Sequence, residues 1–84
     1  MSSKQAIVVY LEEKGEIQGD SEEEKMTFNY LEGGLIDSFE IIEMVMRLES
    51  DFDIQFTPAN MRSEEFRTVG GLVAITDRLV TEKD

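Results

Sequence analysis

A glycine pair and a helix start follow one another in the segment Gly33-Gly34-Leu35-Ile36-Asp37-Ser38-Phe39-Glu40, and a helical run continues from 41 to 51. Glycine favours a break in the chain, and Asp37 with Glu40 three residues later forms a capping box in its aspartate variant. Asp37 is therefore the predicted N-cap, and Ser38 is the first helical residue. We expect the hydroxyl of Ser38 to be exposed beside unpaired backbone N–H groups, at the positive end of a helix dipole.

The hydroxyl of Ser38 is better suited to being modified than to catalysis. The N–H groups and the dipole of a helix start favour a phosphate ester at this position. An activated serine needs an adjacent base, and the chain contains no histidine. We therefore interpret Ser38 as the target of another enzyme. The simpler alternative is that Asp37 and Ser38 only cap a helix, because such caps are common.

The helical run after Ser38 carries apolar residues on two faces. One set has the i, i+3, i+4, i+7 spacing of a core face: Ile41, Met44, Val45 and Leu48. A second set, which we call the outer stripe, falls on roughly the opposite face: Phe39, Ile42 and Met46. A chain of 84 residues buries a limited core, so we expect the outer stripe to face partners, flanked by Glu40, Glu43 and Glu49. The alternative is a central helix that is buried on both faces.

The segment from 34 to 56 resembles the acyl carrier protein family, whose signature is Asp-Ser-Leu followed by an acidic helix that contains methionine. The corresponding residues here are Asp37-Ser38-Phe39 and Glu43-Met44-Val45-Met46-Arg47-Leu48-Glu49. Motif, helix pattern, length and acidity agree, and the likeness extends more loosely over nearly the whole chain. It implies an all-α fold, a small acyl-carrier-type four-helix bundle with three main helices, one short helix and a long first loop.

The resemblance also implies a function. A 4′-phosphopantetheine arm from coenzyme A would be attached to Ser38 and would carry an acyl group as a thioester, while the chain itself is not an enzyme. Asp37 would cap the helix and help the metal site of the phosphopantetheinyl transferase. This transferase and acyl-transfer and fatty-acid synthesis enzymes would dock on Phe39, Glu40, Ile42, Glu43, Met46 and Glu49. The residues expected around the acyl chain are Ile41, Met44, Val45, Leu48 and Ile54.

Several cargoes suit this pattern. A fatty-acyl group is the first expectation. Phe39 in place of the usual leucine, together with the segments 34–39 and 63–68, also resembles the D-alanyl carrier proteins of the same fold. Peptidyl carriers are a further possibility within the family. An alternative from a different class is an unmodified acidic helical adaptor that docks through the outer stripe.

Composition excludes several other classes of protein. The net charge is −11 with only eight Lys and Arg residues, which argues against nucleic acid and favours basic protein partners. The chain has no cysteine and no histidine, so disulfides and the common zinc sites are excluded. No EF-hand pattern and no carboxylate pair in apolar surroundings stands out. No signal peptide or apolar run of about 20 residues is present, so we expect a cytoplasmic monomer without membrane insertion.

We expect one carrier domain over residues 1–84. Its predicted elements are a helix over about 3–14, a long loop over 15–36, a helix over about 38–51, a short helix over about 59–66 and a helix over about 68–81. The span 6–11 also suits a short strand, although no partner strand follows. The loop should be anchored by Ile17, Phe28 and Leu31. Because Gly70 and Gly71 each cost up to about 1 kcal/mol in a helix, we expect mobility where the last helix begins.

Overall fold

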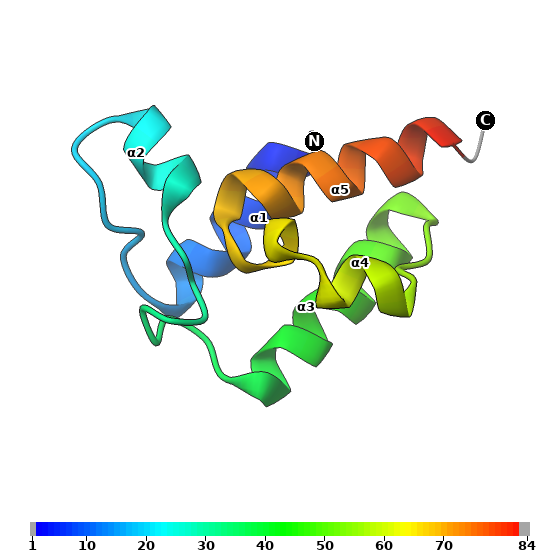
Figure 1. Ribbon diagram of the computed structural model, residues 1–84, viewed down its shortest axis with the longest axis horizontal. Helices are drawn as coiled ribbons and strands as arrows, with labels where there is room; N and C mark the ends of the chain where they lie inside the picture. The colour runs from blue at the N-terminus through cyan, green and yellow to red at the C-terminus, as the bar shows by residue number, and fades with distance from the viewer. Residues whose placement is uncertain (1, 83–84) are drawn as a thin grey trace.

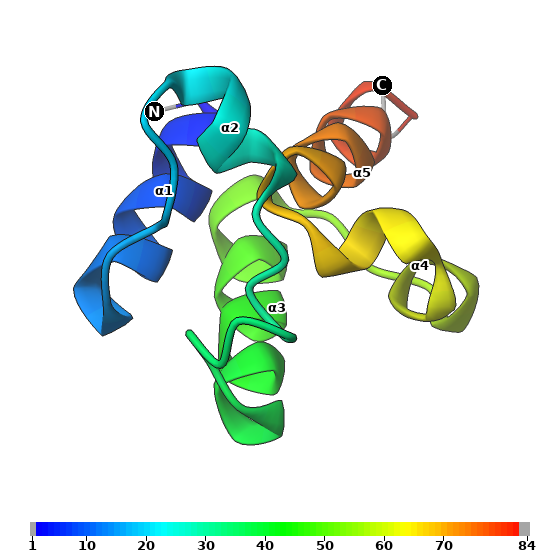
Figure 2. The same cartoon turned by 60° about the vertical axis from the view of Figure 1, so that its left-hand side comes forward.

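The computed structural model describes residues 2–82, and its elements in that range are all helical (Figure 1). They are α1 (Ser3–Lys14), α2 (Glu22–Thr27), α3 (Ser38–Phe52), α4 (Pro58–Arg62), the 3-10 helix η1 (Glu64–Arg67) and α5 (Val69–Glu82). Residues 2–82 contain no β-strand, and one isolated bridge joins Asn29 to Thr68. The three long helices α1, α3 and α5 surround the core, and the short elements lie around them (Figure 2). The predicted all-α carrier-type fold is thus confirmed.

The span 6–11 is helical, as expected, because α1 buries one face and is capped at both ends. Ser2 accepts a hydrogen bond from the Gln5 N–H, and the Gln5 side chain accepts one from the Ser2 N–H, which completes a capping box. The Gly15 N–H closes the other end by donating to the Leu11 carbonyl. Within residues 2–82, the largest fully buried side chains come from all three long helices and from the connection between α1 and α3: Ile7, Leu11, Ile17, Tyr30, Met44, Val69, Leu72, Ile75 and Thr76.

The segment 15–36 is not one continuous loop as predicted, because it contains the helix α2. Ser21 caps this helix by accepting from the Glu24 N–H, and three glutamates in the first turn favour its N-terminus. Of the predicted anchors, Ile17 is buried, and Phe28 and Leu31 are half-buried and pack against the core. The strongest anchor is Tyr30, which the sequence does not distinguish from its neighbours. Its side chain is fully buried and its hydroxyl donates to the Phe66 carbonyl.

The short helix predicted over 59–66 is in fact two helices. Thr57 and Asn60 form a capping box around α4, with Pro58 at its first position. Ser63 then adopts an extended backbone, and its hydroxyl donates to the Asn60 carbonyl at 2.7 Å. This local hydrogen bond competes with helix continuation, so η1 starts afresh at Glu64. Phe66 is buried, as predicted, and the centre of its ring lies 6.2 Å from that of Phe56 in an edge-to-face arrangement.

Gly70 and Gly71 belong to the first turn of α5 and allow other backbone to approach it closely. The Gly71 N–H donates to the Thr68 hydroxyl at 3.0 Å, which caps the helix. A Cβ at Gly71 would lie 1.9 Å from the Glu65 carbonyl oxygen, and one at Gly70 would lie 3.0 Å from that of Met26. The pair therefore permits η1 and α2 to pack on α5. Mobility at this helix start stays a prediction.

Tyr30→Phe should destabilise the fold, because it leaves the buried Phe66 carbonyl without its side-chain donor. We expect a loss of about 1–3 kcal/mol in the free energy of unfolding, measured by urea titration. Tyr10→Phe is the matched control, since its hydroxyl donates to a carbonyl that is only partly buried. If the free energy of unfolding fell equally in the two variants, the Tyr30 hydrogen bond would not stabilise the fold more than that of Tyr10.

Gly71→Ala should lower thermal stability although alanine is the better helix former. The added methyl group would overlap the Glu65 carbonyl, and such overpacking costs about 1–3 kcal/mol. This loss exceeds the gain of up to about 1 kcal/mol in helix propensity. Ala74→Gly, at an exposed position of the same helix, measures the propensity effect alone. A Gly71→Ala protein that melts higher than the native chain would contradict the close packing of η1 on α5.

Candidate functional site

Ser38 is the first residue of α3 and is exposed. The residue before it has an extended backbone, and its carboxylate accepts from the Glu40 N–H at 2.9 Å. In return, the Glu40 carboxylate accepts from the Asp37 N–H at 3.2 Å. The predicted capping box is thus present, and it fixes the backbone on both sides of Ser38.

The helix behind Ser38 has one buried and one exposed apolar face, as the two stripes predict. Met44, Val45 and Leu48 are buried in the core, and Ile41 is half-buried. The outer stripe is exposed: Phe39 by 81%, Ile42 by 58% and Met46 by 62%. An apolar surface of this kind beside Ser38 suits contact with another protein. Met61 of α4 is also exposed, and no sequence pattern marked it as such.

The three predicted flanking glutamates have different environments. Glu43 is exposed on α3. The half-buried Glu49 accepts a hydrogen bond from the Phe56 N–H at 2.9 Å, so it holds the chain that follows α3. Glu40 belongs to the capping box and also lies 3.4 Å from the Lys14 ammonium of α1. Only Glu43 therefore has a side chain whose chief environment is solvent.

The end of α1 packs against the start of α3 through Tyr10 and Lys14. The Tyr10 hydroxyl donates to the Glu40 carbonyl at 3.3 Å, and the Lys14 ammonium lies 5.3 Å from the centre of the Tyr10 ring. The guanidinium of Arg47 is 5.8 Å from the same ring. Burial raises the pKa of the Tyr10 phenol. Tyr10, followed by Glu40, raises the pKa of the Lys14 ammonium, which is therefore charged at neutral pH.

The residues predicted to surround an acyl chain do not share one hollow. Met44 and Leu48 border a hollow of about 10 Å³ beside Tyr10, which is about the space that one water molecule needs. Ile54 is half-buried and borders a separate, open hollow with Leu79. The core below Ser38 is thus closely packed in this conformation.

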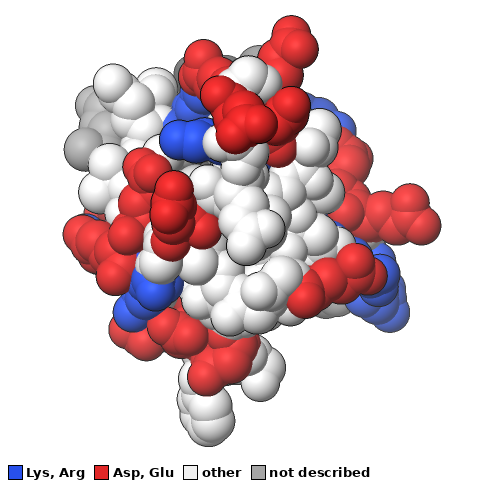
Figure 3. Space-filling view, turned by 90° about the vertical axis from the view of Figure 1, so that its left-hand side faces the viewer, with Lys and Arg blue, Asp and Glu red and all other residues white. Residues whose placement is uncertain are grey.

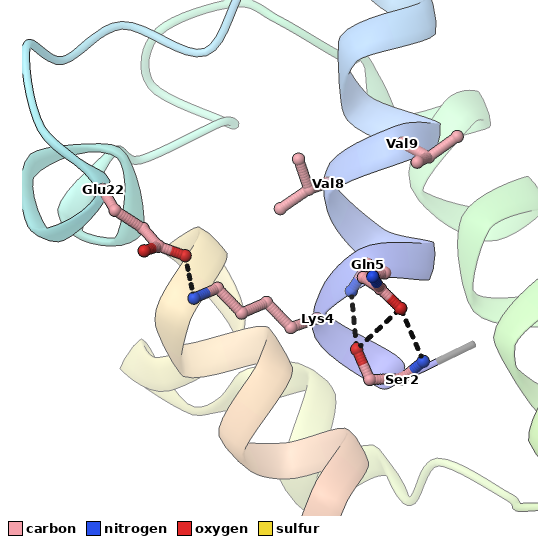
Figure 4. Close-up of a pocket in the computed structure, with 6 residues that line it drawn as sticks. All are labelled: Ser2, Lys4, Gln5, Val8, Val9 and Glu22. Carbon is pink, nitrogen blue, oxygen red and sulfur yellow. Dashed lines mark hydrogen bonds and ion pairs between the residues drawn. The ribbon is translucent and has the colours of Figure 1, made fainter.

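A larger, open hollow lies between α1 and α2, at the end of α1 away from Lys14 (Figure 4). It measures about 670 Å³ and is lined by Ser2, Lys4, Gln5, Val8, Val9 and Glu22. Lys4 and Glu22 form an ion pair across it, and this pair lowers the pKa of Glu22. Among the charged side chains on the face shown in Figure 3, the acidic ones outnumber the basic ones, and much of the remaining surface is uncharged. The sequence did not predict this hollow, because it depends on how α2 packs beside α1, which no local pattern specifies.

Metal clusters and membrane spans are both absent from residues 2–82. That range contains no group of three or more acidic side chains arranged to hold a metal ion. Nor does any helix in it have the length and apolar character needed to cross a bilayer.

Curated proteins similar to this chain share its full length. The D-alanyl carrier protein of Leuconostoc mesenteroides subsp. mesenteroides is 31% identical over 80 residues, which cover 95% of this chain and 99% of that protein. The chain belongs to the D-alanyl carrier protein family. The D-alanyl carrier proteins of Leuconostoc citreum and Lactobacillus acidophilus are 29% and 28% identical, over 95% and 98% of this chain and 99% and 100% of theirs.

Membership of the D-alanyl carrier protein family bears directly on the predicted function. Its members are phosphopantetheine-binding carriers related to acyl carrier proteins, so the predicted family and the carrier role are confirmed. They are carriers and not enzymes. No family model matches the chain, and no solved structure matches it significantly.

Asp37→Ala should weaken the start of α3, because it removes the side chain that accepts from the Glu40 N–H. We expect the free energy of unfolding to fall by about 1 kcal/mol and the Glu40 amide to exchange faster with solvent. Asp37→Asn keeps a capping oxygen and serves as the control. If alanine and asparagine behaved alike, the cap would not stabilise this helix start.

Proposed function

We propose that this chain carries D-alanine as a thioester on a 4′-phosphopantetheine arm attached to Ser38. The observation that supports this most directly is the full-length similarity to D-alanyl carrier proteins. Ser38 is the serine of the Asp-Ser motif, and it is exposed at the first position of α3. The N–H groups and dipole of that position favour a bound phosphate.

The residues around Ser38 suit the arm in three ways. The arm supplies the thiol that this cysteine-free chain lacks. The capping box of Asp37 and Glu40 holds the backbone on which the arm would be mounted. The exposed side chain of Ser38 leaves the hydroxyl open to a transferase. The chain's part in the reaction is therefore to present one oxygen atom in a fixed position.

The surface proposed for partner enzymes is the outer stripe together with Glu43. Its apolar side chains are among the most exposed large hydrophobic residues of the molecule. The net charge of −11 favours approach of a basic enzyme surface, while the apolar contacts would hold the complex. We propose that a phosphopantetheinyl transferase and the enzymes that load and unload the arm use this one surface in turn.

D-alanine is preferred here to the fatty-acyl group that was the first expectation from the sequence. A fatty-acyl chain needs an apolar space, but Met44, Val45 and Leu48 pack closely and border a hollow of only about 10 Å³. An alanyl group carries an ammonium group and a single methyl, so it gains little from burial. The closed core therefore supports the small cargo that the names of the relatives suggest.

Incubation with coenzyme A, magnesium and a broad-specificity phosphopantetheinyl transferase should add one phosphopantetheine to the native chain. Intact-mass spectrometry should show this gain in the native protein and none in Ser38→Ala. Ser63→Ala, which leaves the proposed site untouched, is the control and should gain the arm as the native chain does. No gain with several transferases would overturn the proposal and favour an unmodified adaptor.

The cargo can then be tested on the arm-bearing protein. With ATP, a D-alanine ligase should add one alanyl group that hydroxylamine removes, as expected for a thioester. A fatty-acyl synthetase should load the same protein poorly. Efficient fatty-acyl loading without alanyl loading would reverse the choice of cargo while leaving Ser38 as the attachment site.

A further inference from the structure

Glu40 links the start of α3 to α1 through contacts with Tyr10 and Lys14. We propose, on the basis of the function proposed above for Ser38, that Tyr10 and Lys14 are positioning residues for the modification of Ser38. They hold Glu40 and, through it, the Asp37 cap, so that the Ser38 hydroxyl faces the transferase in one orientation. We call Tyr10 and Lys14 the α1 clamp.

Glu40 uses all of its polar groups in this arrangement. One carboxylate oxygen accepts from the Asp37 N–H at 3.2 Å, and the other lies 3.4 Å from the Lys14 ammonium. Its own N–H donates to the Asp37 carboxylate at 2.9 Å. Its carbonyl accepts from the Tyr10 hydroxyl at 3.3 Å. A displacement of Glu40 would therefore disturb the residue directly before Ser38.

The α1 clamp is itself held firmly in place. Tyr10 is 7% exposed and belongs to the hydrophobic core, so its ring cannot easily move. Lys14 lies against that ring and is the last residue of α1, where the helix dipole favours a cation. The side chains of both Lys14 and Glu40 are only 29% exposed, so solvent screens their attraction less than it screens an open surface pair.

Loss of Lys14 would leave Glu40 in an unfavourable electrostatic environment. The chain carries 19 acidic and eight basic residues, and Glu43 lies three positions further along the same helix. Like charges at this spacing repel one another. Without the ammonium, the Glu40 carboxylate would turn toward solvent more often, and the Asp37 N–H would lose its acceptor for part of the time. Ser38 would then sample more backbone conformations before modification.

Kinetic parameters should separate this positioning role from docking. Lys14→Met removes the charge but keeps an apolar stem against Tyr10. We expect the kcat of phosphopantetheine transfer to fall about threefold, the scale of a partly exposed ion pair. The KM for the carrier should stay equal or fall, because the outer stripe is unchanged and a more acidic carrier approaches a basic enzyme more readily.

Lys4→Met is the matched control. It makes the same change of residue and net charge, and Lys4 also forms an ion pair, but with Glu22 in the hollow between α1 and α2. This variant should retain the native kcat. Both variants are assayed well below their melting temperatures, so that a loss of global stability alone changes neither parameter.

Amide hydrogen exchange gives a reading that does not depend on the transferase. The Asp37 amide should exchange about threefold faster in Lys14→Met than in the native chain, and at the native rate in Lys4→Met. Glu40→Gln should act like Lys14→Met, and the double variant should lose little more than either single one, because both remove the same interaction.

The outcomes distinguish this inference from the function proposed for Ser38. Native Asp37 exchange and native kcat in Lys14→Met, or equal changes in Lys4→Met, would overturn the positioning role while transfer to Ser38 still occurred. No transfer to the native chain would overturn the function of Ser38 and any role in its modification. Faster Asp37 exchange would then show only that the α1 clamp stabilises the cap.

Discussion

The buried hydroxyl of Tyr30 is the interaction on which the arrangement of this molecule depends. Tyr30 lies in the connection between α1 and α3, and its hydroxyl donates to the carbonyl of Phe66 in η1. The same residue also shapes the chain toward α3, because its own carbonyl accepts from the N–H groups of Leu35 and Ile36 at 3.1 and 3.5 Å. Asp37 and Ser38 follow directly. The residue that closes the core thus also sets where α3 begins.

Two neighbouring contacts support Tyr30 and explain the glycines of α5. The Val69 N–H donates to the Phe28 carbonyl at 3.1 Å, and Asn29 pairs with Thr68. These contacts bring the connection against the first turn of α5, where Gly70 and Gly71 leave room for the backbone of Met26 and Glu65. Close backbone approach therefore accounts for two residues that helix propensity alone would disfavour.

Local patterns in the sequence were sufficient to predict the parts of the site that depend on neighbours along the chain. The capping box needs only Asp37 and Glu40, and the two faces of α3 follow from helical spacing. The burial of Tyr30 and the pairing of Lys14 with Glu40 could not be predicted, because their partners lie 36 and 26 positions away. The break at Ser63 depends on a short side-chain bond that competes with a helix, and composition gives no measure of that balance.

Cargo and attachment differ in how far the sequence specifies them. Ser38, its cap Asp37 and the outer stripe all lie in one continuous segment of the sequence. The space available to a cargo depends instead on how the buried residues Met44, Val45 and Leu48 pack against other helices. The proposal of D-alanine as the cargo, in place of a lipid, relies chiefly on the similarity to D-alanyl carrier proteins.

The outer stripe and Ser38 belong to the same helix, so the distance between them is fixed. With a rise of about 1.5 Å per residue, Met46 lies roughly 12 Å along the axis from Ser38. An enzyme that binds the outer stripe would therefore be held at a fixed distance from Ser38 without contacting that residue. Substitutions along the stripe could change which enzymes bind while the geometry of attachment stays constant.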